Sequence, residues 1–194
     1  IYSNDPNSPF ALNVRTIVYD YIDAQYTNET FTVDALETET FWSSALSNYA
    51  DNNLVDGMVA DSYDFSGQWK VGWDRENLFF YFNYVDDMVI TTALKPAKND
   101  AVDIIFDRYN DRDGSSFAEN DNGYYRFNID GSIEGGNVDL SGVESHTILN
   151  DTGFVMEAKI PFAALDFGYG VQAMNGQVFG FDVAYYDVDT GSVA

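Results

Sequence analysis

The sequence predicts an all-β fold, a two-sheet antiparallel β-sandwich of the jelly-roll or immunoglobulin-like kind with at most short helical turns. Six short segments are rich in Val, Ile, Phe and Tyr, and each is bounded by Gly, Asn or Asp. Short apolar segments separated by such turn residues indicate β-strands. Many short strands without a framework helix favour a sandwich.

The 194 residues are enough for one domain with a sizeable core, and we expect residues 31–194 to form it. Residues 1–30 are expected to be an N-terminal extension that ends in the first strand, within the run 13–26. Single helical turns are predicted within 37–50 and 161–168. The other strands are predicted, in chain order, at residues 67–73, 77–85, 101–107, 123–129, 153–160 and 178–186.

The composition is strongly acidic, with 32 Asp and Glu residues against nine Lys and Arg residues and a formal charge of −23. This charge repels phosphate backbones at long range, which excludes nucleic acid as a partner. The sequence has no apolar run of 18 residues, so no membrane insertion is expected. Cysteine is absent, which excludes disulfides and cysteine-ligated zinc. We expect an exported bacterial protein that is secreted, periplasmic or on the cell surface.

Alternation in two predicted strands places several polar side chains on one surface. In residues 101–107 and 123–129, apolar side chains occupy every second position and are expected to face the core. If the two segments pair as an antiparallel hairpin, the intervening positions share one outer face. A carboxylate, a guanidinium, an amide and a ring then line this face, from Asp103, Arg126, Asn128 and Tyr124.

Six motifs follow one another along residues 31–189. They read FTVDALETETFW, WDRENLFFYFNYVDD, NDAVDIIFDRYND, NGYYRFNIDG, GFVMEAKIPFAAL and GQVFGFDVAYYDVD. In this order they resemble the family 9 carbohydrate-binding modules and their DOMON-like relatives.

The resemblance implies a β-sandwich that binds glycans without cleaving them, so no enzymatic activity is expected. It implies bound Ca²⁺, a plant- or algal-type polysaccharide or oligosaccharide as ligand, and an attached glycoside hydrolase or cell-surface domain. Asp103 matches the acidic residue that hydrogen-bonds the sugar in such modules, and Arg126 matches the arginine. Ala97 stands where one of two clamping tryptophans is expected, and the sequence ends at Ala194, before the segment that supplies the other.

On this basis we expect Asp103 and Arg126 to address vicinal hydroxyls of the sugar bidentately. An aromatic ring, from Tyr124 or Trp69, is expected to stack on the apolar face of the pyranose. The alternative is a plain cross-strand ion pair, which at a surface is worth less than about 1 kcal/mol.

An acidic loop follows the strand predicted at 101–107. Ca²⁺ takes six to eight oxygen ligands, and a loop of Asp, Asn and Gly supplies oxygens without large side chains. The alternative is a solvated polar hairpin loop. Two other predicted strands also end in acidic residues, which indicates acidic loops gathered at sheet ends. The candidate calcium ligands are Asp107, Asn110, Asp111, Asp113 and Asp121.

Two other functions remain open. A calcium-stabilised structural or adhesive domain of a larger surface protein predicts metal-dependent melting without glycan affinity. The second open function is that of a haem-binding electron-transfer domain, because some DOMON-like relatives ligate haem through methionine with histidine or lysine. Haem is the less favoured cofactor, since Met156 lies in a core-like alternation and is expected to pack. The candidate axial ligands are Met58, Met88, Met156, Met174 and His146.

Overall fold

The computed structural model describes residues 22–50, 59–91, 99–108, 110, 122–165 and 178–188. In chain order the strands are β1 Gln25–Tyr26, β2 Asn48–Tyr49, β3 Phe65–Trp73, β4 Asn77–Asp86, β5 Ala101–Asp107, β6 Asn122–Asn128, β7 Ile133–Gly136, β8 Glu144–Asn150, β9 Gly153–Pro161 and β10 Gly180–Tyr186; the helical turns are η1 Thr40–Ser43 and α1 Phe162–Leu165.

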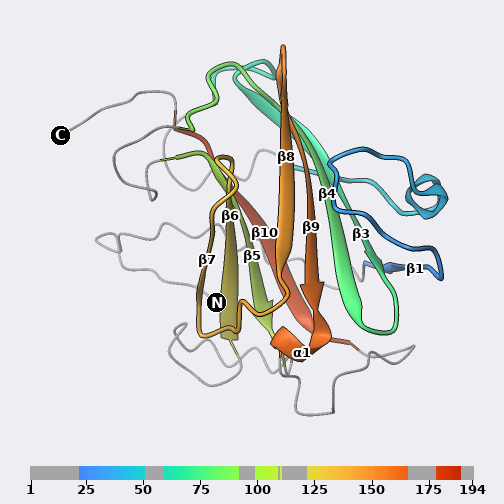
Figure 1. Ribbon diagram of the computed structural model, residues 1–194. Coiled ribbons are helices and arrows are strands. Elements are labelled where there is room, and N and C mark those ends of the chain that lie inside the picture. The colour runs from blue at the N-terminus through green and yellow to red at the C-terminus, as the bar shows by residue number, and fades with distance from the viewer. Residues whose placement is uncertain are drawn as a thin grey trace.

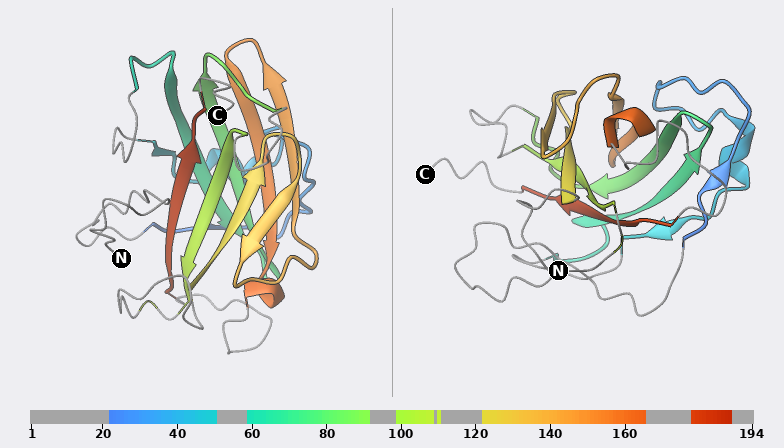
Figure 2. Two further views of the ribbon diagram at one scale, coloured as in Figure 1. Left: turned by 90° about the vertical axis from the view of Figure 1, so that its left-hand side faces the viewer. Right: turned by 90° about the horizontal axis from the view of Figure 1, so that it is seen from below.

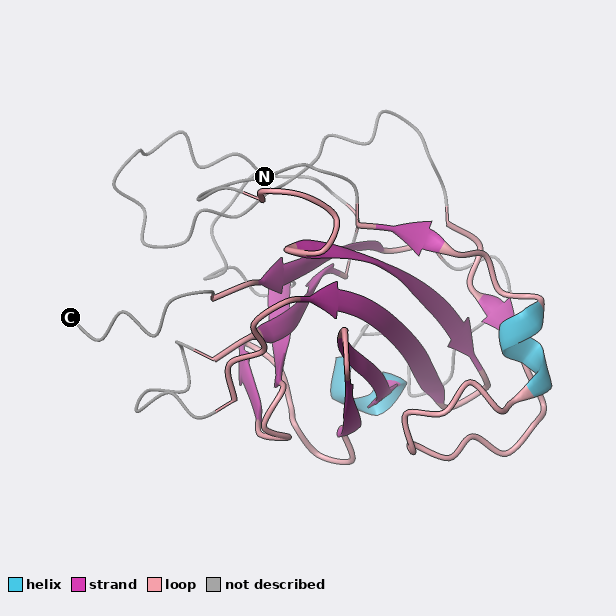
Figure 3. Ribbon diagram, turned by 90° about the horizontal axis from the view of Figure 1, so that it is seen from above, coloured by secondary structure: helices cyan, strands magenta, loops and turns pink. Residues whose placement is uncertain are grey.

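The strands form two sheets that pack face to face (Figure 1). The six-stranded sheet has the order β1–β3–β4–β9–β8, with β2 beside β3, and the four-stranded sheet has the order β10–β5–β6–β7. Viewed from below, the two sheets are separate layers (Figure 2), and from above they curve around a shared interior (Figure 3). None of the helices among the described residues has the length and apolarity needed to cross a membrane.

The predicted sandwich is confirmed, and all six main strands lie within two residues of the predicted bounds. The structure adds β2, β7 and β8, which the sequence does not predict. β7 contains adjacent glycines, and β8 is a sheet-edge strand with mostly polar or exposed residues, so neither shows a clear apolar alternation. Most of the strand predicted within 13–26 lies outside the described residues, and the domain boundary at residue 30 remains a prediction.

The core lies between the sheets and uses the apolar positions expected from alternation. On β5 these are Val102, Ile104 and Phe106, and on β6 they are Tyr125 and Phe127, all at most 1% exposed. The large aromatic content therefore serves mainly to fill the space between two twisted sheets.

The central strand β4 is buried on both faces. Leu78, Phe80 and Phe82 face the core between the sheets, whereas Phe79 and Tyr81 belong to a second cluster on the outer face of the six-stranded sheet. Residues 31–45, here called the strap, cover that outer face with rings that include Phe41 and Trp42. This second layer explains why the run Leu78–Phe82 is continuously apolar instead of alternating.

Glu157 of β9 anchors the strap through a carboxylate that is 0% exposed. Its Oε2 accepts hydrogen bonds from the backbone N–H groups of Asp34 and Ala35, each at 2.9 Å, and its Oε1 accepts one from Trp42 Nε1 at 3.3 Å. Ala35 has a φ of 59°, and this left-handed turn lets two successive N–H groups converge on one oxygen.

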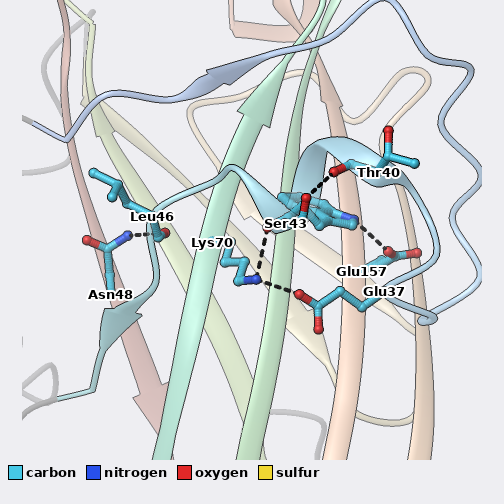
Figure 4. Close-up of polar contacts among 8 residues, drawn as sticks. Glu37, Thr40, Ser43, Leu46, Asn48, Lys70 and Glu157 are labelled. Atoms are coloured by element: carbon cyan, nitrogen blue, oxygen red, sulfur yellow. Dashed lines mark hydrogen bonds and ion pairs between the residues drawn. The ribbon is translucent and has the colours of Figure 1, made fainter.

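Lys70 of β3 also binds the strap, next to Glu157 (Figure 4). Its ammonium group donates to Glu37 Oε1 at 2.5 Å and to the backbone oxygen of Trp42 at 3.0 Å. Burial of Glu157, together with nearby Glu39 and Asp34, raises its pKa to about 7, although the two backbone N–H groups act in the opposite direction.

This raised pKa predicts a pH-dependent contribution to stability. Between about pH 4.5 and 7 the folded state binds more protons at Glu157 than the unfolded state, so the contribution is present at low pH and is lost as pH rises through 7. Glu157→Gln should therefore reduce the loss of unfolding free energy between pH 5 and pH 8 by roughly 1–3 kcal/mol, measured by urea denaturation.

The matched control is Glu144→Gln on β8, because Glu144 is exposed and pairs only with Lys159 on the surface. It should leave the pH profile of the wild-type protein unchanged. A Glu157→Gln protein with the wild-type pH profile would show that protonation of this carboxyl is not linked to folding.

Candidate functional site

The outer face of the four-stranded sheet carries a set of polar residues, here called the polar face. It consists of outward positions, opposite the core residues of each strand. The left view of Figure 2 shows the four-stranded sheet from this outer side. β5 and β6 pair antiparallel, which is the condition under which the sequence places Asp103 and Arg126 on one face, and Asp103 lies directly opposite Arg126. The polar face comprises Asp182, Ala184 and Tyr186 from β10, Asp103 from β5, Tyr124, Arg126 and Asn128 from β6, and Glu134 from β7.

Asp103 and Arg126 form a two-point ion pair at the centre of the polar face. Arg126 Nε donates to Asp103 Oδ1 at 2.7 Å, and Arg126 Nη2 donates to Oδ2 at 2.8 Å. The two side chains are only 12% and 5% exposed, respectively. The pair is thus nearly buried, and removal of one partner leaves a costly unpaired charge. The expectation of a weak surface ion pair does not apply.

Tyr186 holds the guanidinium from the other side. The Cζ atom of Arg126 lies 4.2 Å from the centroid of the Tyr186 ring, which is a cation–π contact. Tyr186 stands on β10, whose antiparallel pairing with β5 sets Tyr186 opposite Ala101 and Ala184 opposite Asp103. Because Ala101 and Ala184 are small, the ring can lie diagonally across toward Arg126.

Tyr124 lies one row further along β6, opposite Gly136 of β7. A Cβ atom at Gly136 would lie 2.4 Å from Cε1 of the Tyr124 ring, so only glycine allows the ring to rest on β7. Asn128, at the other end of the strand, is 0% exposed and donates from Nδ2 to Ser132 Oγ at 3.1 Å.

The electrostatics of the polar face are dominated by burial and by the ion pair. Burial raises the pKa of Asp103, and the hydrogen bonds and charge of Arg126 oppose this effect. The Asp103 hydrogen bond raises the pKa of Arg126 above its already high ordinary value. At neutral pH the arrangement is therefore a carboxylate and a guanidinium that present hydrogen-bonding groups from a fixed position.

Trp69 does not belong to the polar face, in contrast to the prediction that it is a stacking ring there. It points into the core from the six-stranded sheet and packs edge-on against Phe181, with ring centroids 5.7 Å apart. The alternation already carried this signal, because Trp69 shares its phase with Val71 and Trp73, an apolar set.

Only part of the predicted calcium loop can be placed. Asp107 ends β5, and Asn110 follows with a φ of 51° and donates its backbone N–H to the oxygen of Asp107 at 3.3 Å. The other three predicted ligands, Asp111, Asp113 and Asp121, lie outside the described residues.

A different group of acids meets at the opposite end of β5. Asp86 ends β4, Asp100 precedes β5 and Asp187 follows β10, and one carboxylate oxygen from each lies within 4.8 Å of the others. Asp86 is 2% exposed and Asp100 0%. We call these three residues the aspartate cluster.

Two side chains of the aspartate cluster are held by hydrogen bonds. Asp86 accepts from the backbone N–H of Met88 at 2.7 Å and from the Tyr185 hydroxyl at 2.5 Å. Asp100 accepts from the backbone N–H groups of Ile90 and Val188. Clustered, oriented carboxylates are the donor set that hard divalent cations such as Ca²⁺ prefer, so these residues fit the calcium that the family resemblance implies.

Two of the candidate haem ligands point to opposite sides of the six-stranded sheet. Met156 is fully buried in the core, as expected, whereas His146 is exposed and stands opposite Glu157 in the strand register, on the outer face. These two side chains therefore cannot ligate one group together. Met58 and Met174 lie outside the described residues.

Sequence reasoning does not identify Tyr186, Glu134 or Asp182 as part of the site. The alternation of β10 places Asp182 and Tyr186 opposite the core set that includes Phe181 and Tyr185. What the alternation cannot give is the pairing of β10 with β5, because the two strands are far apart in the chain.

Comparison with known proteins gives the family. The model of the family described as "Carbohydrate family 9 binding domain-like" matches residues 33–194. Among curated proteins, "Exoglucanase XynX" from Acetivibrio thermocellus is 25% identical over 201 residues, which is 96% of this chain and 18% of that protein. The chain thus spans less than a fifth of that relative's length.

Two solved structures share the fold, both of a family 9 carbohydrate-binding module from Caldicellulosiruptor kristjanssonii. The complex with glucose is 20% identical, with a TM-score of 0.66 over 86% of this chain and 78% of that chain. The complex with cellotriose is 19% identical, with the same TM-score over 87% and 78%. Because the family model covers most of the chain, this protein belongs to the family 9 carbohydrate-binding modules, which are non-catalytic binding domains.

Proposed function

We propose that the polar face is the sugar-binding surface of this module. The observation that carries the proposal is the Asp103–Arg126 pair, fixed between two strands and packed under the Tyr186 ring. Such a pair is preorganised, so little side-chain freedom is lost when a ligand hydrogen-bonds to it.

The chemistry of the polar face suits a pyranose ring. Asp103 uses two of the five N–H donors of Arg126, and Tyr186 also hydrogen-bonds to the guanidinium, so we expect the remaining donors to reach sugar oxygens. Tyr186 and Tyr124 offer aromatic surface to the C–H groups of the sugar. The similar module from Caldicellulosiruptor kristjanssonii was solved with glucose and with cellotriose, which supports a glucose-containing glycan as the first ligand to test.

The test is Arg126→Lys, which keeps the charge but loses the planar two-point geometry. We expect the affinity for cellotriose, measured by isothermal titration calorimetry, to fall at least about tenfold, which is about 1.4 kcal/mol. The matched control is Arg75→Lys, because Arg75 is an exposed residue in the β3–β4 turn. Wild-type affinity in Arg126→Lys would place the sugar elsewhere.

Arg126→Ala is the poorer test, because it also affects folding. It leaves the nearly buried Asp103 without its partner, so we expect a loss of about 3–5 kcal/mol in unfolding free energy by urea denaturation. The double variant Asp103→Ala with Arg126→Ala should be more stable than Arg126→Ala alone. A double variant that is less stable would contradict the burial argument.

We further propose that the module works as part of an exported protein that degrades or binds plant- or algal-type polysaccharide. The similarity to an exoglucanase several times longer than this chain supports an attached glycoside hydrolase. A structural or adhesive role is the alternative, and metal-dependent melting without affinity for any glycan would favour it.

We propose, third, that Ca²⁺ is a structural ion of this domain and that Asp86, Asp100 and Asp187 hold it. The cluster joins β4 of the six-stranded sheet to the ends of β5 and β10 in the four-stranded sheet. Three carboxylates at this spacing repel one another, and a divalent cation offsets the repulsion. Calcium there would supply a tie between the two layers.

Chelation should therefore lower the melting temperature of the wild-type protein. At a Ca²⁺ concentration about 100-fold above its dissociation constant, the ion stabilises by about 2.7 kcal/mol, or roughly 5–10 °C for a domain of this size. Asp86→Asn should abolish most of the difference between calcium and EDTA in scanning fluorimetry.

Asp113→Asn separates the two candidate calcium sites. It should keep the wild-type response to EDTA if the aspartate cluster holds the ion. Loss of the response in Asp113→Asn but not in Asp86→Asn would move the ion to the loop that the sequence predicts.

A further inference from the structure

Asp182 has a carboxylate oxygen with no partner on the polar face. Its Oδ1 accepts the backbone N–H of Val183 at 2.9 Å, whereas its Oδ2 is buried and makes no hydrogen bond. The residue stands opposite Ile105, one row from the Asp103–Ala184 pair. A buried acceptor without a donor costs stability, and a ligand that supplies the donor would offset this cost.

A second unpartnered acceptor lies on the other side of the ion pair. Asn128 donates from Nδ2 to Ser132, but its Oδ1 is buried and makes no hydrogen bond. Asn128 lies one row from Arg126 in the direction opposite to Asp182, as the strand register shows. The ion pair is therefore flanked on both sides by an oxygen that lacks a donor.

A further unpartnered group of this sheet surface, within the part of the chain that the structure describes, is a donor, Nδ2 of Asn122 at the start of β6. One ligand chemistry satisfies all three groups, because a hydroxyl both donates and accepts a hydrogen bond. A carboxylate or sulfate only accepts, so it could serve Asn122 and Arg126 but neither of the two acceptors.

The charge of the polar face also favours a neutral ligand over an anionic one. Three acidic residues of the polar face, Asp103, Asp182 and Glu134, share the surface with a single arginine among its members. Burial raises the pKa of Asp182 to about 6, so above pH 7 the side chain is a charged acceptor. An anionic ligand therefore meets net negative charge at short range in addition to the overall charge of −23.

We infer that Asp182 accepts a hydroxyl of the bound sugar through Oδ2 and makes the site selective for neutral sugars over uronic acids. The inference rests on the proposed function, since it assumes that the polar face binds the sugar. It adds a specificity-determining residue from β10, and it names the class of ligand.

The test compares Asp182→Asn with the wild-type protein at pH 7.5, using glucose and glucuronic acid as a pair that differs only at C6. Asp182→Asn should bind glucose about tenfold more weakly by isothermal titration calorimetry. Its melting temperature should be unchanged or higher, because the amide removes a buried, unpartnered charge. The matched control is Asp151→Asn in the exposed β8–β9 turn, which should bind both sugars as the wild type does.

Selectivity provides the second readout. The wild-type protein should bind glucuronic acid at least tenfold more weakly than glucose, and Asp182→Asn should narrow that ratio. Weaker glucose binding together with a lower melting temperature would make Asp182 a structural residue and overturn the inference.

The failure of this inference and that of the proposed function are distinguishable. Unchanged glucose affinity in Asp182→Asn, with loss in Arg126→Lys, overturns the role of Asp182 and leaves the sugar site in place. A wild-type protein that binds neither glucose nor cellotriose overturns both.

Discussion

Antiparallel pairing of β5 with β6 sets Asp103 directly opposite Arg126, and it does so because the alternate positions of both strands are needed for the core. A slip of one residue would turn Ile104 and Phe127 toward solvent and bury a carboxylate and a guanidinium among aromatic rings. The hydrophobic core thus fixes the register, and the register assembles the site. The ion pair is a consequence of this constraint, and its near burial then makes it rigid.

Local pattern was sufficient to predict the strands that build this hairpin. The alternation in residues 101–107 and 123–129 gives the face of each side chain, whereas the pairing of the two segments is a hypothesis that the structure confirms. The same logic, applied strictly, would have placed Trp69 in the core with Val71. By contrast, β7 and β8 lie at sheet edges and lack the pattern. The helical turn η1 lies within the predicted range 37–50, but the sequence does not indicate that the strap packs on the outer face of the six-stranded sheet.

Long-range pairing explains what sequence could not give at the site. Tyr186 reaches Arg126 only because β10 lies beside β5, and no local signal specifies that neighbour. The same topology decides which of the acidic strand ends lie close together. β10 and β5 run in opposite directions, so Asp107 lies at one end of the sheet, whereas Asp187 joins Asp86 and Asp100 at the other. Acidic residues at strand ends do lie together, as the sequence indicates, but the direction of each strand decides which of them meet.

Adjacent residues of β10 connect the interior to the polar face. Tyr185 turns inward and donates its hydroxyl to Asp86, while Tyr186 turns outward over Arg126. The two rings are therefore attached to neighbouring residues at the end of one strand. Because packed interiors deform little, the packing of Tyr185 in the core limits where the neighbouring Tyr186 ring can lie. If the polar face binds sugar as proposed, the packing of the core therefore helps to position one of the rings that contact it.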